Sequence, residues 1–138
     1  MDTQQLFIAV AQVLGTLFPD SLVFQGPIPQ GADGQMHIGL RSLTQTHQLG
    51  KRFYRKVTLE VRYFLATRDD AKYMAWGETM LDGLRTLEGD DWQLPVINPT
   101  ISVDESGLYC SCNFNVELYF RETGETAEVM EKLYYTIL

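Results

Sequence analysis

The sequence has little positive charge, few cysteines and histidines, and no long apolar run. Lys and Arg together number 11 against 18 Asp and Glu, which gives a formal net charge of -7 at pH 7. A surface of that sign argues against unspecific binding of the whole protein to nucleic acid or to an anionic membrane, because both attract basic proteins. A local basic patch is compatible with these counts.

No apolar stretch reaches the roughly 18 residues that a membrane-spanning helix needs. The N-terminus carries an acidic residue, Asp2, where a secretory signal has a basic region, and Gln12 interrupts the apolar run that follows. We therefore expect a protein of the cytoplasm with no membrane partner.

The two cysteines, Cys110 and Cys112, lie two residues apart in a strand-like segment. Extended geometry places both side chains on the same side and holds their backbones apart, which suits a disulfide poorly. Burial of both as reduced thiols is the favoured interpretation. The two histidines, His37 and His47, add no metal-binding spacing, so we expect no metal site.

Catalytic signatures are missing as well: the chain has no G-x-S-x-G elbow, P-loop, dinucleotide glycine fingerprint or H-E-x-x-H. The acidic pair Asp90-Asp91, which we expect at a helix end, is better explained by a turn than by acid-base or metal chemistry. We expect no enzymatic activity and no cofactor. A small enzyme or ligand-binding domain stays an alternative whose pocket the sequence does not locate.

What the sequence does contain is a long alternating segment from Lys51 to Leu65. Period-two alternation of apolar and polar residues is typical of a half-buried strand, and we expect this strand in the middle of a sheet. One face carries Phe53, Val57, Leu59, Val61, Tyr63 and Leu65, and the other carries Tyr54, Lys56, Thr58, Glu60 and Arg62.

Other patterns predict the remaining elements. Helices are predicted at 3–18, with Asp2 as N-cap; from Asp69 or Asp70, as N-cap, to Gly89; and at 122–138. Strands are predicted at 21–25, 36–46, 101–103 and 108–120, and an edge strand or extended segment at 92–97. The polar segment 45–51 should join two long strands in a hairpin whose tip projects from the body.

This order predicts an α+β fold: a mostly antiparallel sheet of four to five strands with helices packed on one face. We expect a single domain spanning residues 1–138. Because both long strands alternate, one face of the sheet should be dry and the other polar, so the polar face should meet water or a partner.

Charge is segregated along the chain. Between Met36 and Arg68 there is one acid, Glu60, whereas twelve acids and three basic residues follow from Tyr73 onward. Opposite poles can pair head to tail between copies, which closes a ring when the rotation suits, and complementary charge selects the register. The alternative is that both poles are ordinary solvated faces. The seven basic residues of the first segment are Arg41, Lys51, Arg52, Arg55, Lys56, Arg62 and Arg68.

A nucleic-acid-binding module is a further alternative. The run KRFYRK interleaves basic residues with Phe53 and Tyr54, a combination that can supply phosphate contacts and base stacking. Two observations argue against it: Phe53 belongs to the predicted core face, and the rest of the protein is acidic. We expect no direct nucleic-acid recognition.

The chain resembles the small tail-terminator proteins of long-tailed phages and of phage-derived contractile particles in Gram-positive bacteria. The resemblance covers nearly the whole chain as an order of features. After an N-terminal helix come the strand RFYRKVTLEVRYF with its Tyr63-Phe64 pair, the segment MLDGLRTLE, the strand LYCSCNFNVELYF and the closing segment VMEKL.

The resemblance implies a hexameric ring on the head-proximal end of the tail tube. Such a ring would stop tube polymerisation and offer a surface to the neck or head-completion protein, or to the sheath of a contractile tail. It would assemble in the host cytoplasm and then remain in the virion; another head-tail connector is the nearest alternative. The interface residues that we expect are Lys51, Arg52, Arg55 and Lys56 of the basic hairpin, with Arg62, Asp90 and Asp91.

Overall fold

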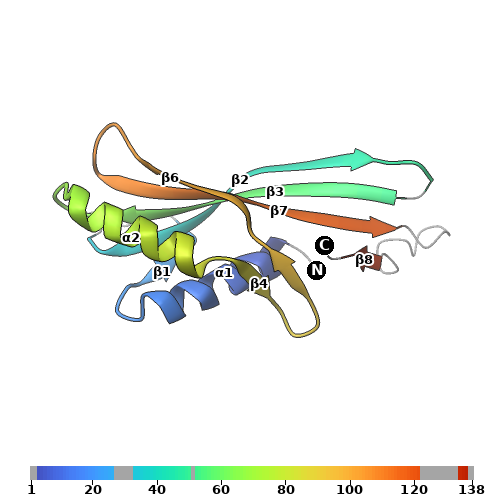
Figure 1. Ribbon diagram of the computed structural model, residues 1–138, viewed down its shortest axis with the longest axis horizontal. Coiled ribbons are helices and arrows are strands. Elements are labelled where there is room, and N and C mark those ends of the chain that lie inside the picture. Colours follow the sequence, from blue (N-terminus) through green and yellow to red (C-terminus); the bar gives the residue numbers. More distant parts are fainter. Residues whose placement is uncertain (1–2, 27–32, 51, 122–133, 137–138) are drawn as a thin grey trace.

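The computed structural model describes residues 3–26, 33–50, 52–121 and 134–136, and these form an α+β fold. Helix α1 spans Thr3–Leu17 and helix α2 spans Asp70–Gly83. Both helices lie on the same side of a large sheet (Figure 1). The predicted fold class is therefore confirmed.

The large sheet has the order β1-β2-β3-β7-β6, and a sixth short strand, β8, pairs with β7. All pairings are antiparallel except that of β1 with β2. A separate two-stranded hairpin pairs β4 with β5. The strands are β1 (Val23–Phe24), β2 (Gln35–His47), β3 (Arg52–Phe64), β4 (Thr86–Glu88), β5 (Gln93–Pro95), β6 (Ile97–Val103), β7 (Tyr109–Arg121) and β8 (Tyr134–Thr136).

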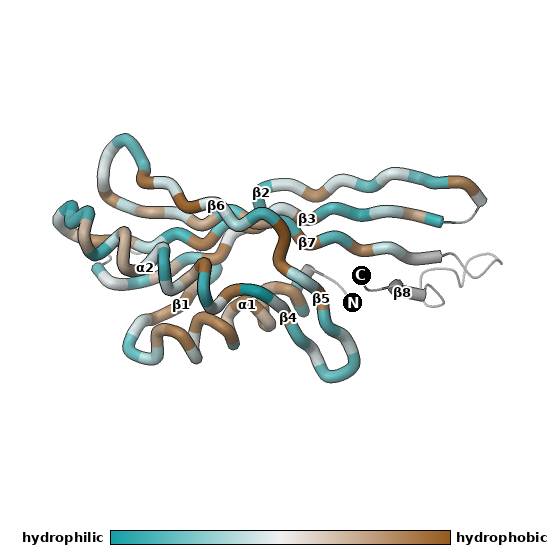
Figure 2. The backbone as a smooth tube through the Cα atoms, in the orientation of Figure 1, coloured by the Kyte–Doolittle hydropathy of each residue, from teal (hydrophilic) through white to brown (hydrophobic). Residues whose placement is uncertain are grey.

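Strand β3 lies in the middle of the sheet, as its sequence predicts. Its alternating residues Val57, Leu59 and Val61 are fully buried beneath the helices. The opposite face of β3 carries polar side chains, and neither helix covers it (Figure 1). Hydrophobic residues accordingly concentrate in α1 and the part of the sheet that faces it (Figure 2).

Helix α2 begins as the sequence predicts. The Asp69 side chain accepts a hydrogen bond from the Lys72 backbone N–H at 3.2 Å, which satisfies one of the free donors at the helix N-terminus. On the buried stripe of α2, Trp76 stacks on Tyr63 with ring centroids 5.3 Å apart, and the Tyr73 hydroxyl donates to the Gly107 carbonyl at 2.7 Å. These contacts fix α2 against the sheet.

The predicted extension of α2 to Gly89 is wrong. The helix ends at Gly83, and residues 86–88 form strand β4 instead. The helical spacing of Leu84 and Leu87 predicts a longer helix. Leu87 is instead buried in β4, where it pairs with Leu94 of β5 across the hairpin. The turn signal at 89–91 therefore closes a β-hairpin and does not end a helix.

The predicted closing helix is also wrong at residues 134–136. These residues form β8, which pairs with β7 from Tyr119 to Arg121. Two tyrosines followed by a threonine have high strand propensity, and the edge of β7 gives them a partner. The rest of that predicted helix, residues 122–133 and 137–138, lies outside the described residues, as does the predicted N-cap Asp2.

The two cysteines are buried and unpaired, as predicted. Both side chains are inaccessible to solvent and belong to the hydrophobic core on the helix side of the sheet. Burial raises the pKa of the Cys110 thiol to about 11. Burial, with a smaller contribution from Cys110, raises that of Cys112 to about 12.

We expect neither thiol to react with a disulfide reagent such as DTNB in the folded protein at pH 8. The reagent cannot reach the buried side chains, and their raised pKa values keep the thiols protonated. In urea, two thiols per chain should react within the mixing time. Rapid labelling of the native protein would contradict the burial of these side chains.

Candidate protein-protein interface

The β2-β3 hairpin forms an arm that extends beyond both helices (Figure 1). We define the arm as residues 41–50 together with 52–56. Every described side chain from Leu40 to Gly50 is exposed to solvent. The projecting hairpin that the sequence predicts is therefore present.

The tip of the arm is ordered by local contacts. Gly50 has a φ of 74°, a conformation that glycine adopts without strain, and the Gln48 N–H donates to the Arg52 carbonyl at 2.8 Å. The His47 ring stacks on Phe53 at 4.8 Å, and its Nε2 lies 2.9 Å from the Gly50 carbonyl oxygen. The turn therefore holds Leu49 outward, where it is 93% exposed.

The predicted basic residues do not share one face of the arm. Arg52 and Lys56 lie on the open polar face of β3, whereas Arg55 lies on the helix-facing side. Arg55 donates from Nε and Nη2 to the Gln45 side chain at 3.1 and 2.7 Å. Lys51 lies outside the described residues.

The aromatic residues of the arm also point to opposite faces. Phe53 packs on His47, while the Tyr54 hydroxyl donates to the Glu117 carboxylate at 2.7 Å. That hydrogen bond, helped by burial and by the nearby negative charge of Glu117, raises the pKa of Tyr54 to about 12. A single stacking surface with flanking cations is therefore not formed here, which disfavours the nucleic-acid alternative.

Arg62 belongs to an ion-pair cluster on the open face. Its Nε donates to Glu60 at 2.7 Å, and its guanidinium lies 4.7 Å from the centre of the Tyr109 ring. Arg41 contacts the second oxygen of Glu60 at 3.5 Å. Glu60 is only 6% exposed, so one buried carboxylate compensates two of the basic residues counted in the sequence. Of the predicted interface residues, Arg62 thus has a clear intramolecular role.

Hydrogen bonds between side chains of neighbouring strands order the remainder of the open face. The Thr58 hydroxyl donates to the Asn115 side-chain oxygen at 2.7 Å, and the hydroxyls of Ser102 and Ser111 lie 3.2 Å apart. No helix of the described residues covers this face (Figure 1). It is a polar, pre-ordered surface rather than a second core.

One edge of the sheet is also open. Strand β1 pairs only with Met36 and His37 of β2, so β2 has no outer neighbour from Ile38 to His47 among the described residues. An edge of that length offers backbone donors and acceptors to another chain. The register shift between Leu40 and Ser42 is its one irregularity.

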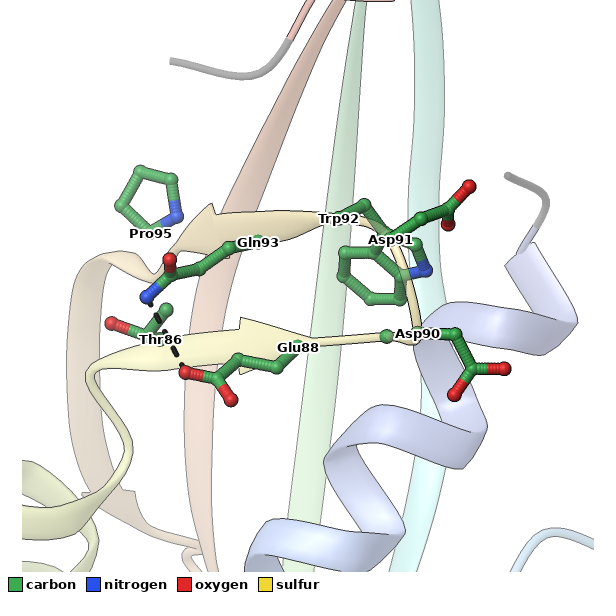
Figure 3. Close-up of a pocket in the computed structure, with 8 residues that line it drawn as sticks. Thr86, Glu88, Asp90, Asp91, Trp92, Gln93 and Pro95 are labelled. Atoms are coloured by element: carbon green, nitrogen blue, oxygen red, sulfur yellow. Dashed lines mark hydrogen bonds between the residues drawn. The ribbon is translucent and has the colours of Figure 1, made fainter.

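Asp90 and Asp91 form the turn between β4 and β5, not a helix end. Both are exposed, and Figure 3 shows them at the turn of the hairpin, beside Trp92 and close to α1. Glu88 accepts a hydrogen bond from Gln93 across the hairpin at 3.3 Å. These three acids lie on one small hairpin, whereas Arg52, Arg55 and Lys56 lie on the arm.

Within the described residues, no three His, Cys, Asp or Glu side chains gather in a group that could hold a metal ion. Neither helix in that part of the chain combines the length and the apolarity that crossing a membrane would require.

Sequence reasoning missed two features of this surface. It treated Glu60 as an exposed strand residue, because alternation does not reveal two arginines converging on one carboxylate. It also passed over Leu49, although an apolar residue directly before a glycine in an otherwise polar turn is the signal that could have identified it.

A protein-family model described as phage tail terminator protein matches residues 5–134, almost the whole chain. This confirms the resemblance found in the sequence. No curated protein matches.

The ion-pair cluster generates a stability prediction. Replacing Glu60 with Gln removes the charge that Arg41 and Arg62 share, and should lower the free energy of unfolding by about 1–3 kcal/mol. Urea unfolding followed by tryptophan fluorescence measures this. Glu78→Gln, an exposed change on α2, should stay within about 0.5 kcal/mol of the wild type. Equal effects in the two variants would contradict the role of the cluster.

Proposed function

Because the chain belongs to the phage tail terminator family, whose members are structural tail proteins that associate with other tail proteins, we propose that it caps the tail tube. In this proposal, copies of the chain form a ring at the head-proximal end of the tube. The ring stops further tube polymerisation and joins the tail to the neck.

The observation that carries this proposal is the arm. A hairpin with no buried side chain between Leu40 and Gly50 contributes nothing to the core. Its strands are held by their own pairing and its tip by local contacts, so its exposed side chains are available to contact another protein. Its basic residues Arg52 and Lys56 lie on the same face, so an acidic surface is the natural partner.

The two faces of the sheet have different roles in this proposal. The helix face builds the core, while the polar open face of β2, β3 and β7 is free to form the wall of a ring. Contacts between the basic arm of one copy and the acidic residues of the next are head-to-tail, and contacts of this type close into rings when the rotation suits. We propose six copies, in line with the resemblance in the sequence.

The partners follow from this position. One side of the ring meets the tube protein, and the other meets the neck or head-completion protein; the sheath joins them if the tail contracts. Assembly takes place in the cytoplasm of the host bacterium, and the ring stays at the tail-neck junction. The chain acts by binding and not by catalysis.

Charge reversal on the arm tests this function. Arg52→Glu with Lys56→Glu should leave the thermal midpoint within a few degrees of the wild type, because both side chains lie outside the core. In phage assembly, the variant should give tails of abnormal length or tails without heads, counted by electron microscopy.

Lys72→Glu is the matched control, since it reverses an exposed charge on α2, outside the arm. It should give normal virions. Tails of normal length, joined to heads, in the Arg52→Glu, Lys56→Glu variant would count against a role of the arm in tail completion.

A further inference from the structure

The tip of the arm presents an apolar side chain that is not packed against the rest of the described structure. Leu49 is 93% exposed, although the turn that carries it is fixed by Gly50 and by the His47-Phe53 stack. Exposing a leucine forgoes about 2 kcal/mol of burial free energy. A protruding leucine three residues before the exposed Arg52 has the form of an anchor for a partner's pocket.

A groove of matching character lies on the helix side of the same chain, between α1 and the β4-β5 hairpin. Two adjoining depressions of about 350 and about 400 Å³ share Ala9, Gln12 and Glu88 and so form one groove along α1. Its apolar lining comes from Ile8, Ala9, Val13, Leu17 and Trp92.

The sequence builds this groove through small residues and one exposed apolar residue. Gly83 leaves space for the Leu17 side chain, which a Cβ at that position would overlap, and Gly89 leaves space for the Trp92 ring in the same way. Ile8, on the groove side of α1, is 48% exposed. The lining therefore includes apolar surface that no described residue covers.

The rim of the groove is acidic. Glu88 and Asp90 line it directly, and Asp91 lies next to them in the same turn (Figure 3). The arm carries the opposite charge in Arg52, which pairs with no acid of its own chain among the ion pairs of the described residues. An apolar anchor flanked by positive charge thus matches an apolar groove rimmed by negative charge.

We propose that the arm of one copy docks into the groove of a second copy, with Leu49 on the apolar lining and Arg52 against the acidic rim. This inference rests on the proposed function and identifies the contact that would join neighbouring subunits. The contact does not form within one copy, since its own Leu49 is almost fully exposed. The turn between β2 and β3 lies away from α1 and the β4-β5 hairpin (Figure 1).

The contact is directional, because the anchor and the groove are different surfaces. Each copy therefore donates one arm and accepts one, and the chain of contacts closes or continues according to the rotation between copies. Removing the anchor should weaken self-association at least about tenfold, the usual effect of a buried aliphatic side chain at the centre of a contact.

Cross-linking with a short bis-maleimide tests the proposal on the full chain. Gln48→Cys combined with Gln12→Cys leaves the anchor and the apolar lining in place, because Gln48 precedes Leu49 and Gln12 is an exposed residue of the groove. This pair should give covalent dimers and higher species, since the native cysteines are buried. The matched control joins Gln48→Cys with Met74→Cys; Met74 is 66% exposed on α2. The control should give at most a trace of covalent dimer. A second variant, Leu49→Ser, is compared with the wild type by sedimentation velocity.

The outcomes separate this contact from the proposed ring. If the wild type and Leu49→Ser self-associate equally, the docking of Leu49 is overturned. Equal cross-linking in the two cysteine pairs overturns it as well. Neither result contradicts the proposed ring. If the wild type is monomeric both alone and on purified tails, and no cross-links form, the docking and the ring are both overturned. Selective cross-linking through position 12, together with weaker association of Leu49→Ser, supports the proposal.

Discussion

The structure depends on the pairing of β3 along its full length. From Phe53 to Phe64, every residue of this strand has a partner in β2 on one side and in β7 on the other. Its backbone donors and acceptors are thereby satisfied without help from loops or water, so its side chains alone decide what each face does. The apolar side holds both helices, and the polar side is left open. The arm exists because β2 and β3 stay paired beyond the point where the helices end.

Charge in this protein is used twice, in different ways. Within the sheet, Glu60 gathers Arg41 and Arg62, and the low exposure of the carboxylate makes this contact part of the fold. At the periphery, Arg52 of the arm and the acids of the β4-β5 turn remain exposed and separate. A count of charged residues along the sequence does not separate those paired within the sheet from those exposed at the periphery. Only the second is available to other proteins, so the effective basic pole is smaller than the composition indicates.

The sequence was sufficient to predict the elements that are determined by residues close together along the chain. Alternation located β3 and β7, and Asp69 marked the start of α2, because strand faces and helix caps depend on neighbours along the chain. It failed where a distant residue decides. Leu87 is buried by Leu94, and Tyr134 to Thr136 are strand because β7 has a free edge. The candidate site divides in the same way: the basic hairpin was predictable, whereas the groove requires α1 and the β4-β5 hairpin to be placed side by side.

The arm has a consequence for how such a protein can diversify. Between Arg41 and Gly50 no side chain is buried, so substitutions there escape the packing constraints that govern β3 and the helices. The core can remain unchanged while this decapeptide adapts to a different neighbour. Gly50 is constrained by its backbone conformation, and His47 and Gln45 by their contacts with Phe53 and Arg55. The same scaffold could in this way serve tails of different composition by exchanging one hairpin.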